Sequence, residues 1–146
     1  MYTASHRVHV DAPIERIVGF LEEPRNHVRM SPGLLSVETT VGDGEGWRGR
    51  YVYQLAGVRL EGTVDAIECD VPSRLVHELT GAIEGRVRAT LEAQDDGTWV
   101  EFRAEYDLPR TVLAVVPEAT ATAYVRRDLE CTLENLKTHL EATGTG

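Results

Sequence analysis

The stretch HVDAPIERIVGFLEEPRN, residues 9–26, decides the start of the fold because it joins a strand to a helix. Apolar and polar side chains alternate over 6–10, which predicts a short strand with one face buried. Pro13 then has the position of a first helical residue, and apolar residues recur at helical spacing until Pro24 ends the pattern. These apolar residues are Ile14, Ile17, Val18 and Leu21. We expect a short helix here, with one further turn over 25–30.

From Leu34 onward the period of the apolar residues becomes two, which predicts six strands. Turn segments such as GDGEG (42–46) and CDVPS (69–73) separate them. Parallel strands need crossovers of a dozen or more residues, so these short connections predict an antiparallel meander. The positions expected to face inward are Leu35, Val37, Thr39 and Val41; Tyr51, Tyr53 and Leu55; Val58, Leu60, Gly62, Val64 and Ala66; Leu75, His77 and Leu79; Val87, Ala89, Leu91 and Ala93; and Val100, Phe102, Ala104, Tyr106 and Leu108.

A long amphipathic helix closes the chain, and we expect it to run from Pro117 to about Ala142. Its apolar stripe consists of Thr122, Val125, Leu129, Leu133, Leu136 and Leu140. Leucines dominate the C-terminal half of the helix, whereas alanines and a threonine populate the N-terminal half. Small side chains under a bent sheet leave room for a ligand, so we expect a cavity beside the first half of the helix.

The opening strand with its APIE helix (12–15), the strand series and the closing segment RRDLECTLENLKTHLE (126–141) together resemble the START-like, or SRPBCC, superfamily. The likeness is greatest to its polyketide cyclase/dehydrase and lipid-transport type proteins, and it covers essentially all of 1–146 as a single domain. The resemblance implies an α+β helix-grip fold. In that fold, a curved antiparallel sheet of about seven strands wraps around one long C-terminal helix, a short helical segment follows the first strand, and an apolar cavity lies between sheet and helix. No shared catalytic motif transfers residue by residue, so the fold does not settle the activity.

Charge and composition exclude several classes of function. The formal charge is −9, from 24 acidic and 15 basic residues, which disfavours binding to nucleic acid or to an anionic membrane surface. No apolar run reaches the ~18–20 residues of a membrane span, and the first residues lack a signal-peptide pattern. We therefore expect a cytoplasmic protein without stable membrane insertion, either a monomer or a homodimer. Neither a zinc-type cysteine spacing nor an HExxH motif occurs, so no metal and no cofactor are expected.

The leading hypothesis is binding of a small hydrophobic ligand: a lipid, an isoprenoid or quinone, or a polyketide-like aromatic compound. Small inward residues, including Gly62 and Ala66, would leave the space for it. The candidate ligand-binding residues are Tyr51, Tyr53, Leu60, His77, Ala89, Phe102, Ala104, Tyr106, Glu118, Ala119, Thr122 and Arg126. The tyrosines offer apolar rings with a polar end, and Glu118 with Arg126 would frame the cavity mouth. Core filling by the tyrosines, and solvent exposure of the two charged side chains, are the alternatives.

His77 is the candidate catalytic residue because it is the only histidine placed mid-strand on an apolar face. There it would orient a ligand oxygen or move a proton, unless it is a core histidine bonded to a neighbour. A cyclase or dehydratase using the same cavity is therefore a second hypothesis. A partner-binding domain of the chaperone-regulator kind is a third, with the outward-facing Tyr124 as its best indication. The apolar run 112–116 is either a gate over the cavity or a buried connection.

Overall fold

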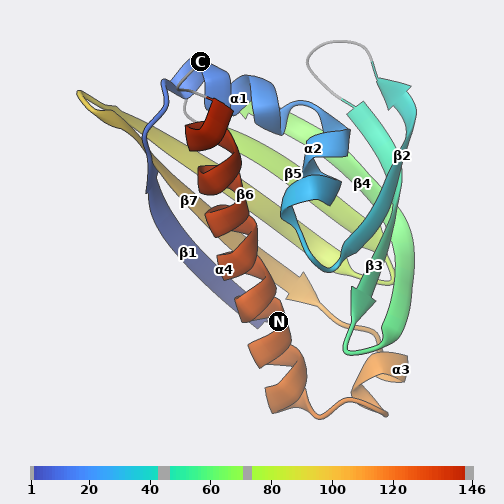
Figure 1. Ribbon diagram of the computed structural model, residues 1–146. Helices are drawn as coiled ribbons and strands as arrows, with labels where there is room; N and C mark the ends of the chain where they lie inside the picture. Colours follow the sequence, from blue (N-terminus) through green and yellow to red (C-terminus); the bar gives the residue numbers. More distant parts are fainter. Residues whose placement is uncertain (1, 43–46, 71–73, 144–146) are drawn as a thin grey trace.

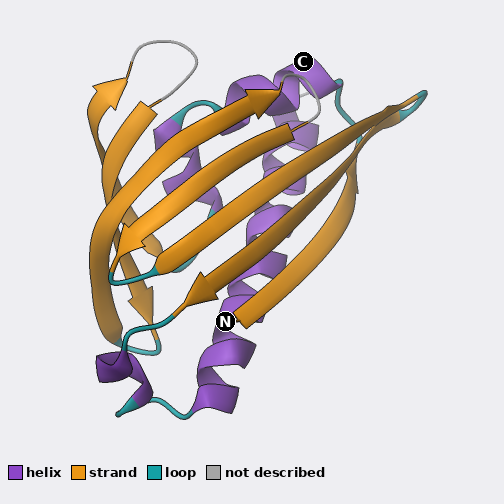
Figure 2. Ribbon diagram, turned by 180° about the vertical axis from the view of Figure 1, so that it is seen from behind, coloured by secondary structure: helices purple, strands orange, loops and turns teal. Residues whose placement is uncertain are grey.

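The computed structural model describes residues 2–42, 47–70 and 74–143. In chain order the elements are β1 (Tyr2–Val10), α1 (Ile14–Leu21), α2 (Pro24–Met30), β2 (Leu34–Gly42), β3 (Trp47–Leu55), β4 (Val58–Asp70), β5 (Arg74–Gly81), β6 (Glu84–Gln94), β7 (Gly97–Asp107), α3 (Arg110–Leu113) and α4 (Glu118–Thr143). The strands form one antiparallel sheet in the order β1-β7-β6-β5-β4-β3-β2. The sheet curves, and α4 lies along its concave face with α1 and α2 beside it (Figures 1 and 2). The predicted seven-stranded helix-grip fold is confirmed.

The two prolines of the opening segment mark the helix starts, although not both as expected. Pro13 keeps an extended backbone and caps α1 from outside, so the helix begins one residue later, at Ile14. Pro24 occupies the first turn of α2, where its missing N–H costs nothing, and it starts this helix as well as ending the first. The expected further turn over 25–30 is thus a separate helix of seven residues.

Strand β1 is longer than the alternation over 6–10 predicts. It pairs with β7 from Tyr2, opposite Tyr106, to Val10, opposite Thr98. The alternation of apolar and polar residues in fact continues back through Ala4 and Tyr2, and Ala4 is buried, so the strand begins earlier than residue 6. The edge strand therefore covers nearly the full length of β7.

The turns between strands agree with the sequence where the structure describes them. Ala56 and Gly57 both have positive φ, 49° and 86°, as a two-residue hairpin turn requires. The expected GDGEG and CDVPS turns include 43–46 and 71–73, which lie outside the described residues.

A bulge in β2 reverses one prediction. The register of β2 against β3 shifts between Leu34 and Ser36, so two residues of β2 stand opposite one position of its neighbour. Leu34 consequently lines the interior, while Leu35 is 41% exposed. The expectation that Leu35 faces inward was wrong, because a bulge interrupts the alternation of inward-facing and outward-facing residues.

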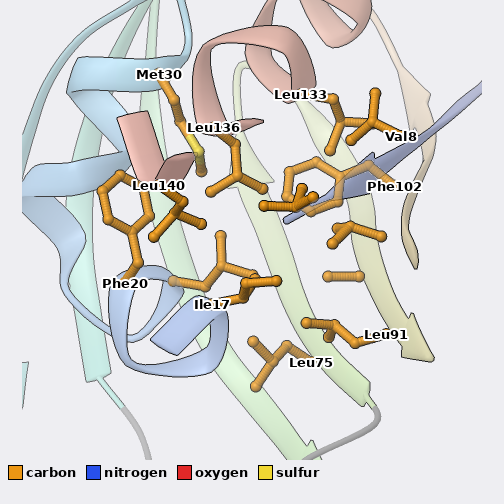
Figure 3. Packing of buried hydrophobic residues seen from close by; sticks show 14 of the residues in the cluster. Val8, Ile17, Phe20, Met30, Leu75, Leu91, Phe102, Leu133, Leu136 and Leu140 are labelled. Carbon is orange, nitrogen blue, oxygen red and sulfur yellow. The ribbon is translucent and has the colours of Figure 1, made fainter. Parts of the chain in front are cut away.

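The hydrophobic core is densest under the C-terminal half of α4. Leu133 and Leu136 are fully buried there and pack with Ile17 of α1 and Phe102 of β7 (Figure 3). A second cluster of buried residues lies towards the other end of the sheet, around Tyr51, Leu55 and Tyr106. The leucine-rich half of the helix is therefore the half that the sheet grips.

Candidate functional site: an apolar cavity between the sheet and helices α2 and α4

A cavity of about 190 Å³ lies inside the curve of the sheet. Its floor comes from strands β2 to β7, and its other walls come from α2, the end of α1 and the middle of α4. Most of the lining is aliphatic or aromatic, as in Leu55, Val64 and Phe102. A concave, mostly apolar space with a few polar groups is the usual form of a small-molecule site.

Seven of the twelve predicted site residues line this cavity: Tyr51, Tyr53, His77, Ala89, Phe102, Ala104 and Tyr106. They come from β3, β5, β6 and β7, where the alternation of the strands indicated the inward face. Ala89 and Ala104 are the small residues that leave the space open. Gly62 leaves none for a ligand, because the ring and hydroxyl of Tyr51 occupy the position that a side chain there would take.

The other five predicted residues lie away from the cavity. Leu60 is buried in the second core cluster, Glu118, Ala119 and Arg126 are exposed, and Thr122 is half-buried. Four of these belong to the N-terminal part of α4, which extends past the sheet towards α3 (Figure 1). The helix lines the cavity farther along, through Val125, Asp128, Leu129 and Thr132. Of the apolar run 112–116, Val112 and Val116 are buried and Val115 is 69% exposed, and none of the five residues lines the cavity.

A pair of histidines forms one polar part of the cavity wall. His77 of β5 and His27 of α2 meet edge to face, with ring centroids 5.1 Å apart. His27 Nε2 donates a hydrogen bond to the main-chain oxygen of Leu21 at 2.7 Å, which assigns the proton of the neutral ring to Nε2. Burial lowers the pKa of both histidines. For His77, burial and the neighbouring His27 together lower the pKa to about 3. Both rings are therefore neutral at physiological pH.

Asp128 of α4 forms a second polar part of the wall. Its carboxylate accepts hydrogen bonds from the Gly33 main-chain N–H at 2.8 Å and from Ser31 Oγ at 3.2 Å. The Tyr53 hydroxyl donates to the same carboxylate. Burial raises the pKa of Asp128, while the three donors oppose that shift and favour the ionised form. The same surroundings raise the pKa of Tyr53, chiefly through burial.

Tyr51 and Tyr106 differ in how their hydroxyls are used. The Tyr51 hydroxyl accepts from the Ile83 N–H at 3.0 Å, and its proton lies within reach of the carbonyls of Thr80 and Ile83, so it holds the β5–β6 turn. Tyr106 is 4% exposed and stacks on Tyr2, and its hydroxyl bonds to no other residue in the described part of the chain. Burial raises the pKa of Tyr106 to about 12, so its hydroxyl stays a donor.

Sequence reasoning missed His27, Ser31 and Asp128 as lining residues. Asp128 precedes Leu129, so it lies about 100° from that residue around the helix axis, beside the apolar stripe and not on it. The helical pattern therefore gave no signal for Asp128. His27 and Ser31 carried none either, since α2 and the segment after it take their places only in the folded chain.

A family model described as "Polyketide cyclase / dehydrase and lipid transport" matches residues 1–141. The chain belongs to this family. No curated protein matches the chain significantly.

Solved structures of proteins from several bacteria have the same fold. The protein TTHA0849 from Thermus thermophilus superposes with a TM-score of 0.84 at 16% identity, covering 97% of this chain and 98% of that one. The Zhui aromatase/cyclase from Streptomyces sp. R1128 gives 0.79 at 14% identity, with 95% and 93% covered. A START superfamily protein from Mycobacterium smegmatis gives 0.77 at 15% identity, with 98% and 99% covered. At these identities the likeness concerns the fold alone.

Among the described residues, no group of three or more His, Cys, Asp or Glu side chains is placed to hold a metal ion. Within the same part of the chain, no helix combines the length and apolarity needed to cross a bilayer.

Proposed function

We propose that this polyketide cyclase / dehydrase and lipid transport family protein binds a small hydrophobic ligand in the cavity between the sheet and α4. The observation that carries the proposal is the cavity itself, whose walls are mostly aliphatic and aromatic and whose polar groups are few and localised. Closely packed interiors leave few voids larger than a water molecule, so a space of this size indicates a ligand site.

The volume limits the size of the ligand. An apolar cavity of roughly 150 Å³ holds benzene, so the 190 Å³ found here suits a compound of one or two rings. A long acyl chain or a compound of four fused rings would require the walls to move apart. Of the ligand types that the sequence suggests, a compact aromatic or isoprenoid fragment fits best.

The geometry supports binding rather than proton transfer by His77. A general acid or base works best when its pKa lies near the operating pH. Burial and the neighbouring His27 lower the pKa of His77 to about 3, so the ring is a weak base and is not charged near neutrality. As a neutral group on the cavity wall it serves to orient a ligand.

A cavity-filling variant tests the proposal. Ala104→Phe places a ring in the cavity, and we expect it to abolish the chemical-shift changes that naphthalene causes in the ¹H–¹⁵N NMR spectrum of the wild-type protein. Ala119→Phe is the matched control: it makes the same change at an exposed position of α4, and its response to naphthalene is expected to equal that of the wild type.

Stability must be followed alongside binding, because an added ring strains a packed interior. The more conservative Ala89→Leu fills part of the same space and keeps the test valid should Ala104→Phe fail to fold. A folded Ala104→Phe or Ala89→Leu protein that still binds naphthalene like the wild type would refute the proposal.

A further inference from the structure

The charged side chains around the cavity differ in the direction they point. Two lining residues within the described part of the chain carry charged side chains, Asp128 and Arg86. Arg86 lies between the inward-facing Gly85 and Val87 on β6, and its guanidinium is 3.8 Å from Glu78 on the outer face of the sheet. Asp128 comes from α4, whose Val125, Leu129 and Thr132 also line the cavity. Among the described residues, the one charge presented to the interior is therefore negative.

The hydrogen bonds to Asp128 leave one acceptor position of its carboxylate unused. A carboxylate has about four acceptor positions. Gly33 N–H takes one on Oδ1, Ser31 Oγ takes one on Oδ2, and the Tyr53 hydroxyl takes a third. The remaining acceptor position suits one further donor, and a donor entering the cavity can supply it.

From this arrangement we infer that the cavity selects a compact, uncharged hydroxylated compound, of the phenol or cyclic-alcohol class, whose hydroxyl donates to Asp128. The inference rests on the proposed ligand-binding function and names the chemistry of its ligand. The rings lie against Phe102 and the aliphatic walls, and the hydroxyl lies at α4.

A ligand that carries a carboxylate or an ammonium group in place of the hydroxyl fits this site less well. A ligand carboxylate would bring a second negative charge beside Asp128 in surroundings of low dielectric constant, where like charges repel strongly. A ligand ammonium would satisfy one of its three N–H groups on Asp128 and leave the others against apolar walls, and unpaired buried donors are costly. A hydroxyl has one proton for the one free acceptor position, so it brings no second charge and leaves no donor unpaired.

An isosteric series tests the selection. Binding of naphthalene, 2-naphthol, 2-naphthoate and 2-naphthylmethylammonium is measured at pH 7.5 by NMR titration and calorimetry. We expect 2-naphthol to bind at least tenfold more tightly than naphthalene. We expect 2-naphthoate and the ammonium compound to bind at least tenfold more weakly than 2-naphthol.

Two variants separate charge from hydrogen bonding. Asp128→Asn removes the negative charge and keeps the size, so the ratio of 2-naphthol to 2-naphthoate affinity is expected to fall at least tenfold. Tyr53→Phe removes one hydrogen bond to Asp128 but keeps its charge, so this variant is expected to discriminate against 2-naphthoate as the wild type does. Should Asp128→Asn fail to fold, the wild-type series and Tyr53→Phe still decide the question.

The possible outcomes distinguish the two proposals. If none of the four compounds binds, the proposed function fails and the inference fails with it. If naphthalene binds and Ala104→Phe abolishes its binding, the cavity is a ligand site. In that case, 2-naphthoate or the ammonium compound binding as tightly as 2-naphthol would overturn the inference alone.

Discussion

Protonation of His77 should make the stability of this protein fall steeply in mild acid. The pKa of His77 is lowered from 6.5 to about 3 by burial, with the neighbouring His27 adding to the shift. The unfolded chain therefore binds this proton more readily than the folded chain does. The contribution of His77 to stability is complete well above pH 6.5 and is progressively lost as the pH falls from 6.5 towards 3.

The magnitude follows from the two pKa values. Between pH 8 and pH 5, a histidine with a pKa of 6.5 in the unfolded state and about 3 in the folded state lowers the free energy of unfolding by about 2 kcal/mol. His27 adds to the effect in the same direction, because burial lowers its pKa as well. A loss of this size is a large fraction of the stability of an ordinary domain.

Urea unfolding followed by circular dichroism at pH 8, 6.5 and 5 measures the effect. The comparison is between the wild type and His77→Gln, which keeps a polar side chain of similar length without a titrating ring. We expect the wild type to lose about 2 kcal/mol more than the variant between pH 8 and pH 5. Parallel losses in the two proteins would show that His77 is not held neutral by the cavity wall, and the electrostatic reasoning would be wrong.

Two further predictions concern the fold that carries the cavity. Leu136→Ala removes a fully buried side chain where α4 packs on the sheet, so urea unfolding should show a loss of about 2–5 kcal/mol, whereas the exposed Glu130→Ala on the same helix should change stability by less than about 0.5 kcal/mol. Thr98→Val leaves the Ala12 carbonyl without the hydrogen bond that Thr98 Oγ1 donates at 2.9 Å, and we expect a loss of about 1–3 kcal/mol in the same assay. Equal stability of Leu136→Ala and Glu130→Ala, or of Thr98→Val and the wild type, would contradict the packing and hydrogen bonding described here.

The strands and helices were largely predictable because their signals are local. Period-two alternation depends on the geometry of a single strand, and helical spacing on that of a single helix. The exception is a place where a partner strand intervenes. The bulge in β2 turns Leu35 outward, and it depends on the pairing of β2 with β3 and not on the residues of one strand alone.

The candidate site was predictable on the sheet and not on the helices. Which residues of a strand face inward follows from the alternation within that strand. Tyr53, His77 and Ala104 were predicted to face inward on this ground, and they line the cavity. Which part of a long helix lies over a cavity depends on where the sheet ends. The small residues near Ala119 indicated an open space, yet Ala119 is exposed, Ala121 is buried in the second core cluster, and Asp128 lines the cavity instead.

Four features follow from the amino-acid sequence alone: the order of elements, the antiparallel meander, the amphipathic closing helix and the family resemblance. Each depends on local periodicity or on motifs in one stretch of chain. Other features arise only in the folded molecule: the position of α4 along the sheet, the contact of His27 with His77, and the meeting of Ser31, Gly33 and Tyr53 at Asp128. Apart from Ser31 and Gly33, the groups in these contacts are separated by tens of residues in the chain. Their proximity results from the curvature of the sheet and from the packing of α2 and α4 against it, which no local pattern encodes.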